Sequence, residues 1–359
     1  MLMDTLVFHC NHMSQQLLLI MKGCFVLFFC FSLVSFSSLD GLKKIVNEKL
    51  CFVSNNCINQ ILDQGRSYLN DDINIYMCCF QRSSVFSGDG GVIYVTGGTQ
   101  TLNISNTVFY ECRCSGFGGA ISAKCQNSVL QMVCARNCSG SQDHFAILEA
   151  GNINNVMYLS MSMCSDSTIG FYPLFLKNGS QRFDNSNSSM NKAVANTGIC
   201  IVSPVSFTSN RCSFSNNYAS DRVCIEYYGN TGLISYINVV HNNSPNLLGV
   251  LLVHNKGSYT VEYSIFYMNS NTLLFIGDEA HLSVSHSFIY HEGLVHSGSI
   301  DTSNNNTNSQ KNTYKLMFFQ SQYCFADNPA GKEQFVNTIQ HSGKKSFINA
   351  ALFFAMFEQ

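Results

Sequence analysis

The sequence repeats itself about every 26 residues, and this repeat constrains the fold more than any other feature. The pair Gly90–Gly91 opens an apolar burst, and Gly118–Gly119 opens a similar one 28 residues later. Once per period a bulky residue, here called an anchor, closes a run of alternating apolar and polar residues. The anchors are Phe80, Phe109, Cys134, Met163, Met190, Phe214, Val240, Phe266 and Ile289, spaced by 23 to 29 residues. A fixed period of this length indicates a solenoid, in which each repeat buries its apolar face against its neighbours.

Each period holds three short runs typical of strands. A second apolar burst follows each anchor after nine to thirteen residues, centred on Ile93, Ile121, Ile147, Phe175, Cys200, Ile225, Leu251 and Phe275. A third alternating run precedes the next anchor, as in "VEYS" and "LSVS". Helical repeats are excluded because no window shows apolar residues at i, i+3, i+4 and i+7, and a propeller blade needs about 40 residues. The chain is therefore predicted to be all-β: a single-stranded right-handed parallel β-helix of nine to ten coils over residues 38–326.

Asparagine recurs at the third position after the anchor, at Asn137, Asn217, Asn243 and Asn269. Asparagines stacked on one another in successive coils can share amide hydrogen bonds along the axis. Asparagine also tolerates the left-handed conformation that a sharp corner requires. The repeat therefore predicts an asparagine ladder at one corner, and it predicts that the two Gly-Gly pairs are equivalent corners.

The composition is low in charge. Charged residues make up 12% of the chain and the net charge is −2, so the basic patch expected of a nucleic-acid-binding protein is missing and no nucleic-acid partner is predicted. The chain has 25 Gly but only 4 Pro, which fits many tight turns.

Residues 1–37 are predicted to be a signal peptide. The mostly apolar run Cys24–Val34 follows Lys22, and the small residues Ser35 and Ser37 fit a cleavage site that leaves Ser38 as the first mature residue. Initiation at Met21 would give a more ordinary signal peptide. The alternative is an uncleaved anchor over residues 17–34. A secreted or cell-surface location is expected in either case.

The C-terminal tail, residues 327–359, is predicted to be poorly ordered or divergent. Its apolar run Phe347–Phe357 has eleven residues, too few to span a bilayer. The chain would then contact a membrane only through an N-terminal anchor or a missing C-terminal helix.

Fourteen of the 17 cysteines follow Ser37, an even number compatible with disulfide bonds in an exported protein. Stacked corners are expected to bring Cys138 near Cys112 or Cys114, and unpaired thiols are the alternative. Cys134 and Cys200 are expected to point inward. Six N-glycosylation sequons begin at Asn103, Asn137, Asn178, Asn187, Asn242 and Asn305.

No catalytic, cofactor-binding or metal-binding residue is predicted. Four histidines recur every five residues, at His281, His286, His291 and His296, but a zinc protease motif needs two histidines four apart on a helix. They are expected to lie in turns or to face solvent. Carboxylates such as Glu149 and Glu226, or Asp166 and Glu292, fall several coils apart, and Asp221–Arg222 is expected to be an isolated surface pair. No catalytic cluster is expected.

Several phrases, among them "GGVIYV", "FSNNYASD", "VVHNNSPNLLGVLLV" and "QSQYCFADNP", resemble a family of parabasalid (Trichomonas-type) surface proteins that are similar to polymorphic outer-membrane proteins. The resemblance covers about residues 50–329. It implies a surface β-helix that acts in adhesion, with no catalytic residue to carry over. Larger members continue after the Asn-Pro with a stalk and a transmembrane helix, and this chain departs from them there.

Three hypotheses follow. The favoured one is a non-enzymatic secreted or cell-surface β-helix that binds glycans or proteins of host or neighbouring cells. The second is a polysaccharide lyase or glycoside hydrolase on the same fold, which would need a carboxylate cluster in a lateral groove. The third is a truncated, non-functional copy of a longer family member.

Overall fold

The computed structural model describes residues 66–68, 72–76, 78–85, 88–164, 170–220, 224–244, 249–271, 273–290, 294–306 and 314–316. The chain divides into two compact units, Met1–Asn47 and Glu48–Gln359, and all described residues belong to the second. Their regular structure consists of strands only, β1 to β27. The predicted signal peptide and the tail 327–359 lie outside the described residues. No helix in the described part of the chain is long and apolar enough to cross a membrane.

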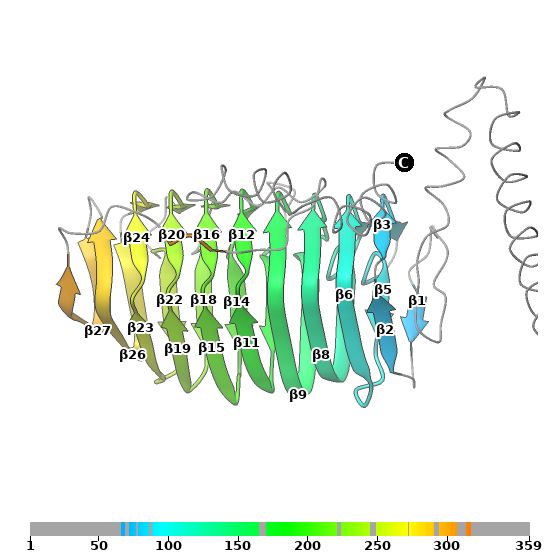
Figure 1. Cartoon of the computed structure of the whole chain (residues 1–359), viewed down its shortest axis with the longest axis horizontal. Coiled ribbons are helices and arrows are strands. Elements are labelled where there is room, and N and C mark those ends of the chain that lie inside the picture. The colour runs from blue at the N-terminus through cyan, green and yellow to red at the C-terminus, as the bar shows by residue number, and fades with distance from the viewer. Residues whose placement is uncertain are drawn as a thin grey trace, which may run out of the picture. The chain divides into compact units, whose positions relative to one another are not determined.

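The strands form three parallel stacks, called A, B and C here, with one strand of each per coil (Figure 1). Stack A contains β1 (Arg66–Tyr68), β5 (Ile93–Val95), β10 (Tyr172–Lys177), β14 (Ile199–Val202), β18 (Ile225–Tyr228) and β22 (Leu251–His254). Stack B contains β2 (Ile73–Tyr76), β11 (Ser180–Asp184), β15 (Ser206–Asn210), β19 (Thr231–Ser235) and β23 (Ser258–Glu262). Stack C contains β3 (Cys79–Gln81), β12 (Asn187–Ser189), β16 (Ser213–Ser215), β20 (Asn238–Val240) and β24 (Ile265–Tyr267).

Longer strands bend around the corners and join more than one stack. They are β6 (Thr101–Tyr110), β8 (Ile121–Arg136), β9 (Asp143–Ser162), β26 (Leu273–Tyr290) and β27 (Leu294–Asn306). Two-residue strands complete the corners: β4 (Ser84–Val85), β7 (Arg113–Cys114), β13 (Lys192–Ala193), β17 (Tyr218–Ala219), β21 (Asn243–Ser244) and β25 (Ser270–Asn271). The predicted right-handed parallel β-helix is thereby confirmed.

The register confirms the repeat. Ile93 pairs with Ile121, and Ile225 pairs with Leu251, so the offset between coils is 28 residues at one place and 26 at the other. Among the anchors, Phe80 pairs with Phe109. Each coil therefore adds one strand to each stack, as the sequence period predicts.

Four anchors were wrongly placed. Cys134 and Val240 are each one residue from the stacked position, which is occupied by Ala135 and Val239, and Met163 and Met190 are each two residues from it. Met163 and Met190 have positive φ angles of 53° and 55° and form corners, and Met163 is exposed. The residues that stack at the anchor position are Met161 and Ser188, two residues earlier in each coil. Apolar side chains at a corner resemble the end of a strand in sequence, so the pattern alone placed the strand ends too late.

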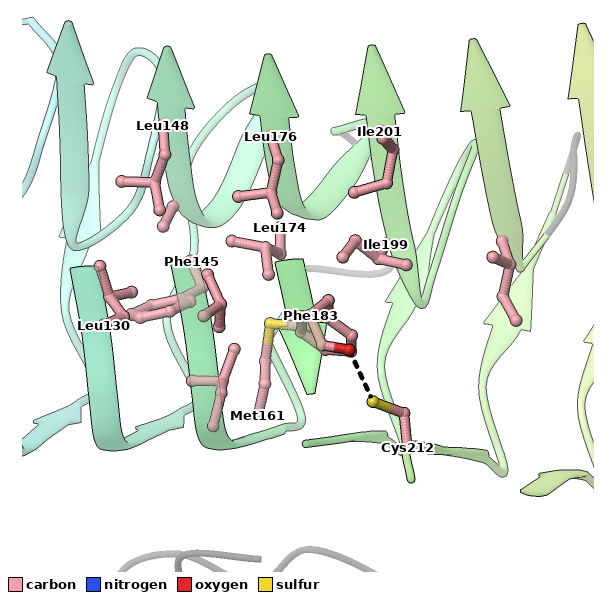
Figure 2. Close-up of a cluster of buried hydrophobic side chains, with 14 of the residues drawn as sticks. Leu130, Phe145, Leu148, Met161, Leu174, Leu176, Phe183, Ile199, Ile201 and Cys212 are labelled. Carbon is pink, nitrogen blue, oxygen red and sulfur yellow. Dashed lines mark hydrogen bonds between the residues drawn. The ribbon is translucent and has the colours of Figure 1, made fainter. Parts of the chain in front are cut away.

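Inward side chains of all three stacks form one continuous core. Leu148 pairs with Leu176, and Leu176 pairs with Ile201, so aliphatic side chains stack on one another along the axis (Figure 2). The thiol of Cys212 donates a hydrogen bond to the carbonyl oxygen of Phe183 at 3.0 Å in the same core. Burial of such side chains contributes about 1.5–3 kcal/mol each relative to exposure, and no coil can bury its inner face alone.

Corners recur at fixed positions with a left-handed backbone. One row, two residues after the anchor position, consists of Arg82, Glu111, Asn137, Met163, Met190, Asn216, His241 and Met268; a second row consists of Asn106, Met132, Tyr158, Asn185, Arg211, Tyr236, Tyr263 and His286. Few of these residue types favour a positive φ, which costs about 1–2 kcal/mol for a non-glycine residue. Inter-coil hydrogen bonding therefore imposes the conformation.

The Gly-Gly pairs are equivalent corners, as predicted. The amide of Gly90 donates to the carbonyl of Phe117, and that of Gly91 donates to Gly118. At Gly118, where φ is +66°, a Cβ atom would collide with the carbonyl oxygen of Ile121. Glycine is required there because the backbone has both a positive φ and no room for a side chain.

An internal column of polar side chains lies directly after the first row of corners. Its seven members, called the corner column below, are Cys112, Cys138, Cys164, Asn191, Asn217, Asn242 and Asn269, all buried. The backbone N–H of Asn191 donates to Oδ1 of Asn217 at 3.0 Å, and the backbone N–H of Asn217 donates to Oδ1 of Asn242 at 3.1 Å. The predicted asparagine ladder exists. Asn137 and Asn243 are not in it: Asn137 is the corner residue itself, and Asn243 follows the ladder residue Asn242.

Candidate functional site

Two features of the solenoid bring functional side chains together. The first is the second row of corners on the outer surface. Tyr236 and Tyr263 are about two-fifths exposed, and their rings stack with centroids 5.2 Å apart. The ring of Tyr263 stacks in turn on that of His286, at 5.0 Å. Because the ring faces cover one another, the row offers hydroxyl groups and ring edges at a spacing of one coil.

The second feature is a network of two carboxylates and a histidine on the outward side of stack A. Nδ1 of His254 lies 2.8 Å from Oδ2 of Asp278, and Nε2 lies 2.9 Å from Oε1 of Glu226. The ring of Tyr228 stacks on the imidazole, with centroids 3.9 Å apart and planes 4° apart. The amide of Asn196 donates to Oε2 of Glu226.

Strand alternation places these side chains. In β18, Ile225 and Tyr227 point into the core, so Glu226 between them points outward. Register then aligns His254 with Tyr228 on one side and with Asp278 on the other. Glu226 is 1% exposed, whereas the Asp278 side chain is 62% exposed. One end of the network is therefore buried and the other faces solvent.

The network favours a charged imidazole. Burial opposes the charge, but the hydrogen bonds to Glu226 and Asp278 outweigh it and raise the pKa of His254. As imidazolium, His254 donates one N–H to each carboxylate. Both ring nitrogens are thereby occupied, so the imidazole offers no free nitrogen to act as a base in this arrangement.

The thiol of Cys200 lies beside this network, where it contacts the carboxylate of Glu226 rather than the imidazole of His254. Its Sγ lies 3.8 Å from Oε2 of Glu226. A thiol nucleophile would need the imidazole nitrogen within hydrogen-bond reach. The described residues contain no group of three or more His, Cys, Asp or Glu side chains arranged to hold a metal ion.

Sequence reasoning missed this network and expected Glu226 to be isolated from other carboxylates. The signal was present, because Glu226, His254 and Asp278 occupy successive coils, at offsets of 28 and 24 residues. Relative to the burst centres Ile225, Leu251 and Phe275, which pair in register, Glu226 lies at +1 and His254 and Asp278 lie at +3. Strand alternation therefore puts all three on one face of adjacent coils.

A separate buried carboxyl lies near the Gly-Gly corners. Asp143 begins β9 and is 3% exposed. Burial, with a smaller contribution from the charge of Asp89, raises the pKa of Asp143 to about 7. This carboxyl is neutral in mildly acidic solution.

The glycosylation candidates differ in exposure. Asn187 and Asn242 are fully buried, and the amide of Asn242 is hydrogen-bonded within the ladder. A glycan at either position is incompatible with this packing, which corrects the prediction there. Asn103, Asn137 and Asn178 are half-buried at the surface, and Asn305 lies in β27. A sequon is defined by its sequence alone, so it carries no information on whether the asparagine is buried.

Of the disulfide candidates, Cys112 and Cys138 are neighbours in the corner column, and Cys114 lies beyond it in β7. All three are free thiols. Thiol–thiol contacts join Cys138 to Cys112 on one side and to Cys164 on the other. Cys164 completes a stack of three that the sequence analysis did not identify.

Cys134 and Cys200 point outward, contrary to expectation. Val133 and Ala135 on either side of Cys134 lie in the core, as do Ile199 and Ile201 around Cys200. A shift of one residue moves a strand side chain to the opposite face. Both predictions were wrong because the cysteine, rather than its two apolar neighbours, was taken as the inward residue.

The remaining candidates stay dispersed or undescribed. His281, His286 and His296 are exposed, as expected for solvent-facing histidines. Glu149 forms partly exposed ion pairs with Lys124 and Lys177, at 3.8 and 3.5 Å, which contribute little to stability. Asp166, Asp221, Arg222, His291 and Glu292 lie outside the described residues.

No protein-family model, no curated protein and no solved structure matches this chain.

Proposed function

We propose that this protein is a non-enzymatic β-helix, exported to the cell surface or beyond, that binds glycans or proteins of host or neighbouring cells. The observation that carries the proposal is the second row of corners, where exposed or half-buried side chains repeat once per coil. Tyr236, Tyr263 and His286 offer hydrogen-bonding edges in a regular line with little charge. Such a line suits weak contacts with a partner that is itself repetitive.

Multivalency supports the same proposal. One row of tyrosines and polar groups offers modest affinity, but many copies on one surface raise the overall affinity without any new contact. The sequence resemblance to parabasalid surface proteins points in this direction as analogy.

The network around His254 favours a second candidate, a polysaccharide lyase or hydrolase. Glu226 and Asp278 approach one imidazole from adjacent coils, and paired carboxylates are what such enzymes need. Against it, Glu226 is buried, and both imidazole nitrogens already have partners. Substrate would have to displace part of this network.

A single comparison separates the two candidates. The full chain is assayed for binding to cultured cells and immobilised glycans, and for turnover of a panel of acidic and neutral polysaccharides. The double variant Tyr236→Ala/Tyr263→Ala is expected to lower binding at least fivefold. The matched control Tyr218→Ala, which changes an equally exposed tyrosine in β17, is expected to bind as the wild type does.

Turnover that is abolished by Glu226→Gln, in a protein that binds no cells or glycans, would reverse the order of the candidates. Binding that is equally strong in the tyrosine double variant would exclude the second row as the contact surface.

A further inference from the structure

Three cysteines, Cys112, Cys138 and Cys164, lie above one another inside the solenoid and are called the cysteine stack here. They occupy the same position in three successive coils, because the residues two positions before them pair in register. All three side chains are 0% exposed. Neighbouring coils are about 4.8 Å apart, so the Cα atoms of adjacent cysteines lie within the range of about 4.4–6.8 Å that disulfide bonds require.

The backbone fixes this register on both sides of the first pair, Cys112 and Cys138. Just before the pair, the N–H of Glu111 donates to the carbonyl oxygen of Arg136 at 2.9 Å. Just after it, the N–H of Ser139 donates to the carbonyl oxygen of Cys112, also at 2.9 Å. The two cysteines are therefore held side by side by the solenoid itself and not by any contact of their own side chains.

Cys138 is the shared member of the stack, because its sulfur contacts the sulfurs of both neighbours. Burial opposes the charged form of this thiol, but hydrogen bonds from the thiols of Cys112 and Cys164 lower the pKa of Cys138. Burial raises the pKa of Cys112 and the pKa of Cys164. The central cysteine is thus the first to reach the thiolate form, which is the nucleophile in disulfide chemistry.

Among the described residues, the stack ends after three sulfurs. The position before Cys112 is occupied by Ser83, and the position after Cys164 is occupied by Asn191, whose Oδ1 accepts the N–H of Cys164 at 2.8 Å. Cys112 and Cys164 are two coils apart, about 10 Å, which exceeds the separation of about 7 Å that a disulfide tolerates. Three sulfurs therefore allow one disulfide, which must include Cys138, and leave one thiol beside it.

We propose that the cysteine stack is a redox site: under oxidising conditions Cys138 forms one disulfide, with Cys112 or with Cys164, and the remaining thiol exchanges with it. In the exchange, the thiolate of the remaining cysteine attacks the sulfur of Cys138 and displaces the other cysteine as a thiolate. One S–S bond forms as another breaks, so no electrons are gained or lost. The two neighbours lie on opposite sides of Cys138, which places the attacking and the leaving sulfur on opposite sides of the central one.

The first formation of the bond needs an oxidant, and a disulfide compound such as oxidised glutathione suffices. The thiolate of Cys138 attacks it and releases one glutathione, and the thiolate of a neighbouring cysteine then displaces the second. Two protein thiols lose two electrons and two protons, and the external disulfide becomes two thiols. Because the stack is closed to solvent in the folded chain, the oxidant reacts while the chain folds.

The test uses the full chain, refolded from urea with oxidised and reduced glutathione, alkylated with N-ethylmaleimide in acidic urea and digested with trypsin without reduction. Trypsin places Cys112 in residues 83–113 and both Cys138 and Cys164 in residues 137–177. A bond to Cys112 joins the two peptides, whereas a bond to Cys164 closes a loop within the second. Both products are expected, each with the third cysteine alkylated. A single product, three alkylated thiols, or a bond from Cys138 to a cysteine outside the stack overturns the proposal.

Variants separate the two linkages. Cys112→Ser is expected to give only the loop, and Cys164→Ser only the joined peptides. Cys138→Ser is expected to lose both bonds, because the two remaining sulfurs are too far apart to meet. The control Cys212→Ser changes a buried free thiol outside the stack and is expected to leave both products as in the wild type. A bond between the two outer cysteines in Cys138→Ser, or the absence of the remaining linkage in either of the other two stack variants, contradicts the proposal.

Discussion

The corner column has two halves with one backbone geometry and two chemistries. In the amide half, from Asn191 to Asn269, each side-chain oxygen accepts a hydrogen bond from the backbone N–H of the preceding coil. In the thiol half, the backbone N–H of Cys112 faces the sulfur of Cys138, and that of Cys138 faces the sulfur of Cys164. The halves meet where the N–H of Cys164 donates to Oδ1 of Asn191 at 2.8 Å.

The difference shows what this corner demands. A buried N–H in every coil needs an acceptor, and either an amide oxygen or a weakly accepting sulfur fills the role. The amide does more, because its NH₂ group also donates to the carbonyl of the preceding coil, as Asn217 does to Ser188 at 2.9 Å. The thiol instead packs as a small apolar group. The amide half should therefore be more stable to unfolding and less tolerant of substitution.

The largest expected effect comes from Asn217→Ala. The change leaves the N–H of Asn191 and the carbonyl of Ser188 buried without this partner, at about 1–3 kcal/mol each, so the free energy of unfolding should fall by about 2–5 kcal/mol. Urea unfolding measures it. The adjacent-coil control Asn243→Ala removes a half-exposed amide outside the ladder and should change the free energy by about 0.5 kcal/mol or less. Similar losses in the two variants would remove the distinction between ladder and surface.

The next effect concerns Asp143, which follows Cys138 of the thiol half by five residues. Its pKa is raised to about 7 in the folded chain and is about 3.9 when unfolded. The folded state then binds more protons between these values, so stability falls as pH rises from about 4 to 7. Asp143→Asn should remove this dependence and stabilise the protein above pH 7 by roughly 2–4 kcal/mol. Unfolding at pH 4, 5.5 and 8 tests it; parallel pH profiles for wild type and variant contradict it.

In the amide half the corresponding ionisation is that of His254. Its raised pKa contributes stability that is complete below about pH 6.5 and is lost as pH rises through the folded pKa. Glu226→Gln should lower that pKa and cost roughly 1–3 kcal/mol at pH 6, with little effect at pH 9. Proton NMR titration of the imidazole measures the pKa. His281→Gln, at an exposed histidine in β26, serves as control; an unaltered His254 titration in Glu226→Gln would show that the carboxylate does not set it.

The smallest effect is expected for Cys138→Ala, in the middle of the thiol half. It removes one buried sulfur and one weak acceptor, and should cost about 1–2 kcal/mol. Urea unfolding beside Asn217→Ala gives the comparison directly. A loss as large as that of Asn217→Ala would mean that sulfur satisfies the corner as well as an amide does.

Period and composition predicted the architecture because every coil must offer an inner apolar face, which leaves a repeated trace in sequence. They predicted register only to within one or two residues. This accuracy was sufficient to predict that Ile93 stacks on Ile121. It was not sufficient for Cys134 and Cys200, which were predicted to point inward, or for corner residues such as Met163, which were assigned to strands. The network around His254 could have been predicted, because the burst centres Ile225, Leu251 and Phe275 pair in register and so place Glu226, His254 and Asp278 on one face of adjacent coils.

The left-handed corners have a consequence for how such a molecule can change over generations. Arginine, glutamate, asparagine, methionine and histidine all occur in the first corner row with the same backbone conformation, because the neighbouring coils, not the side chain, hold it there. Each corner is thus a position at which the residue type can be substituted while the fold is kept. Along the solenoid axis, at about 4.8 Å per coil, the outer edge therefore presents a row of side chains whose identities can diverge in evolution while the backbone conformation stays the same.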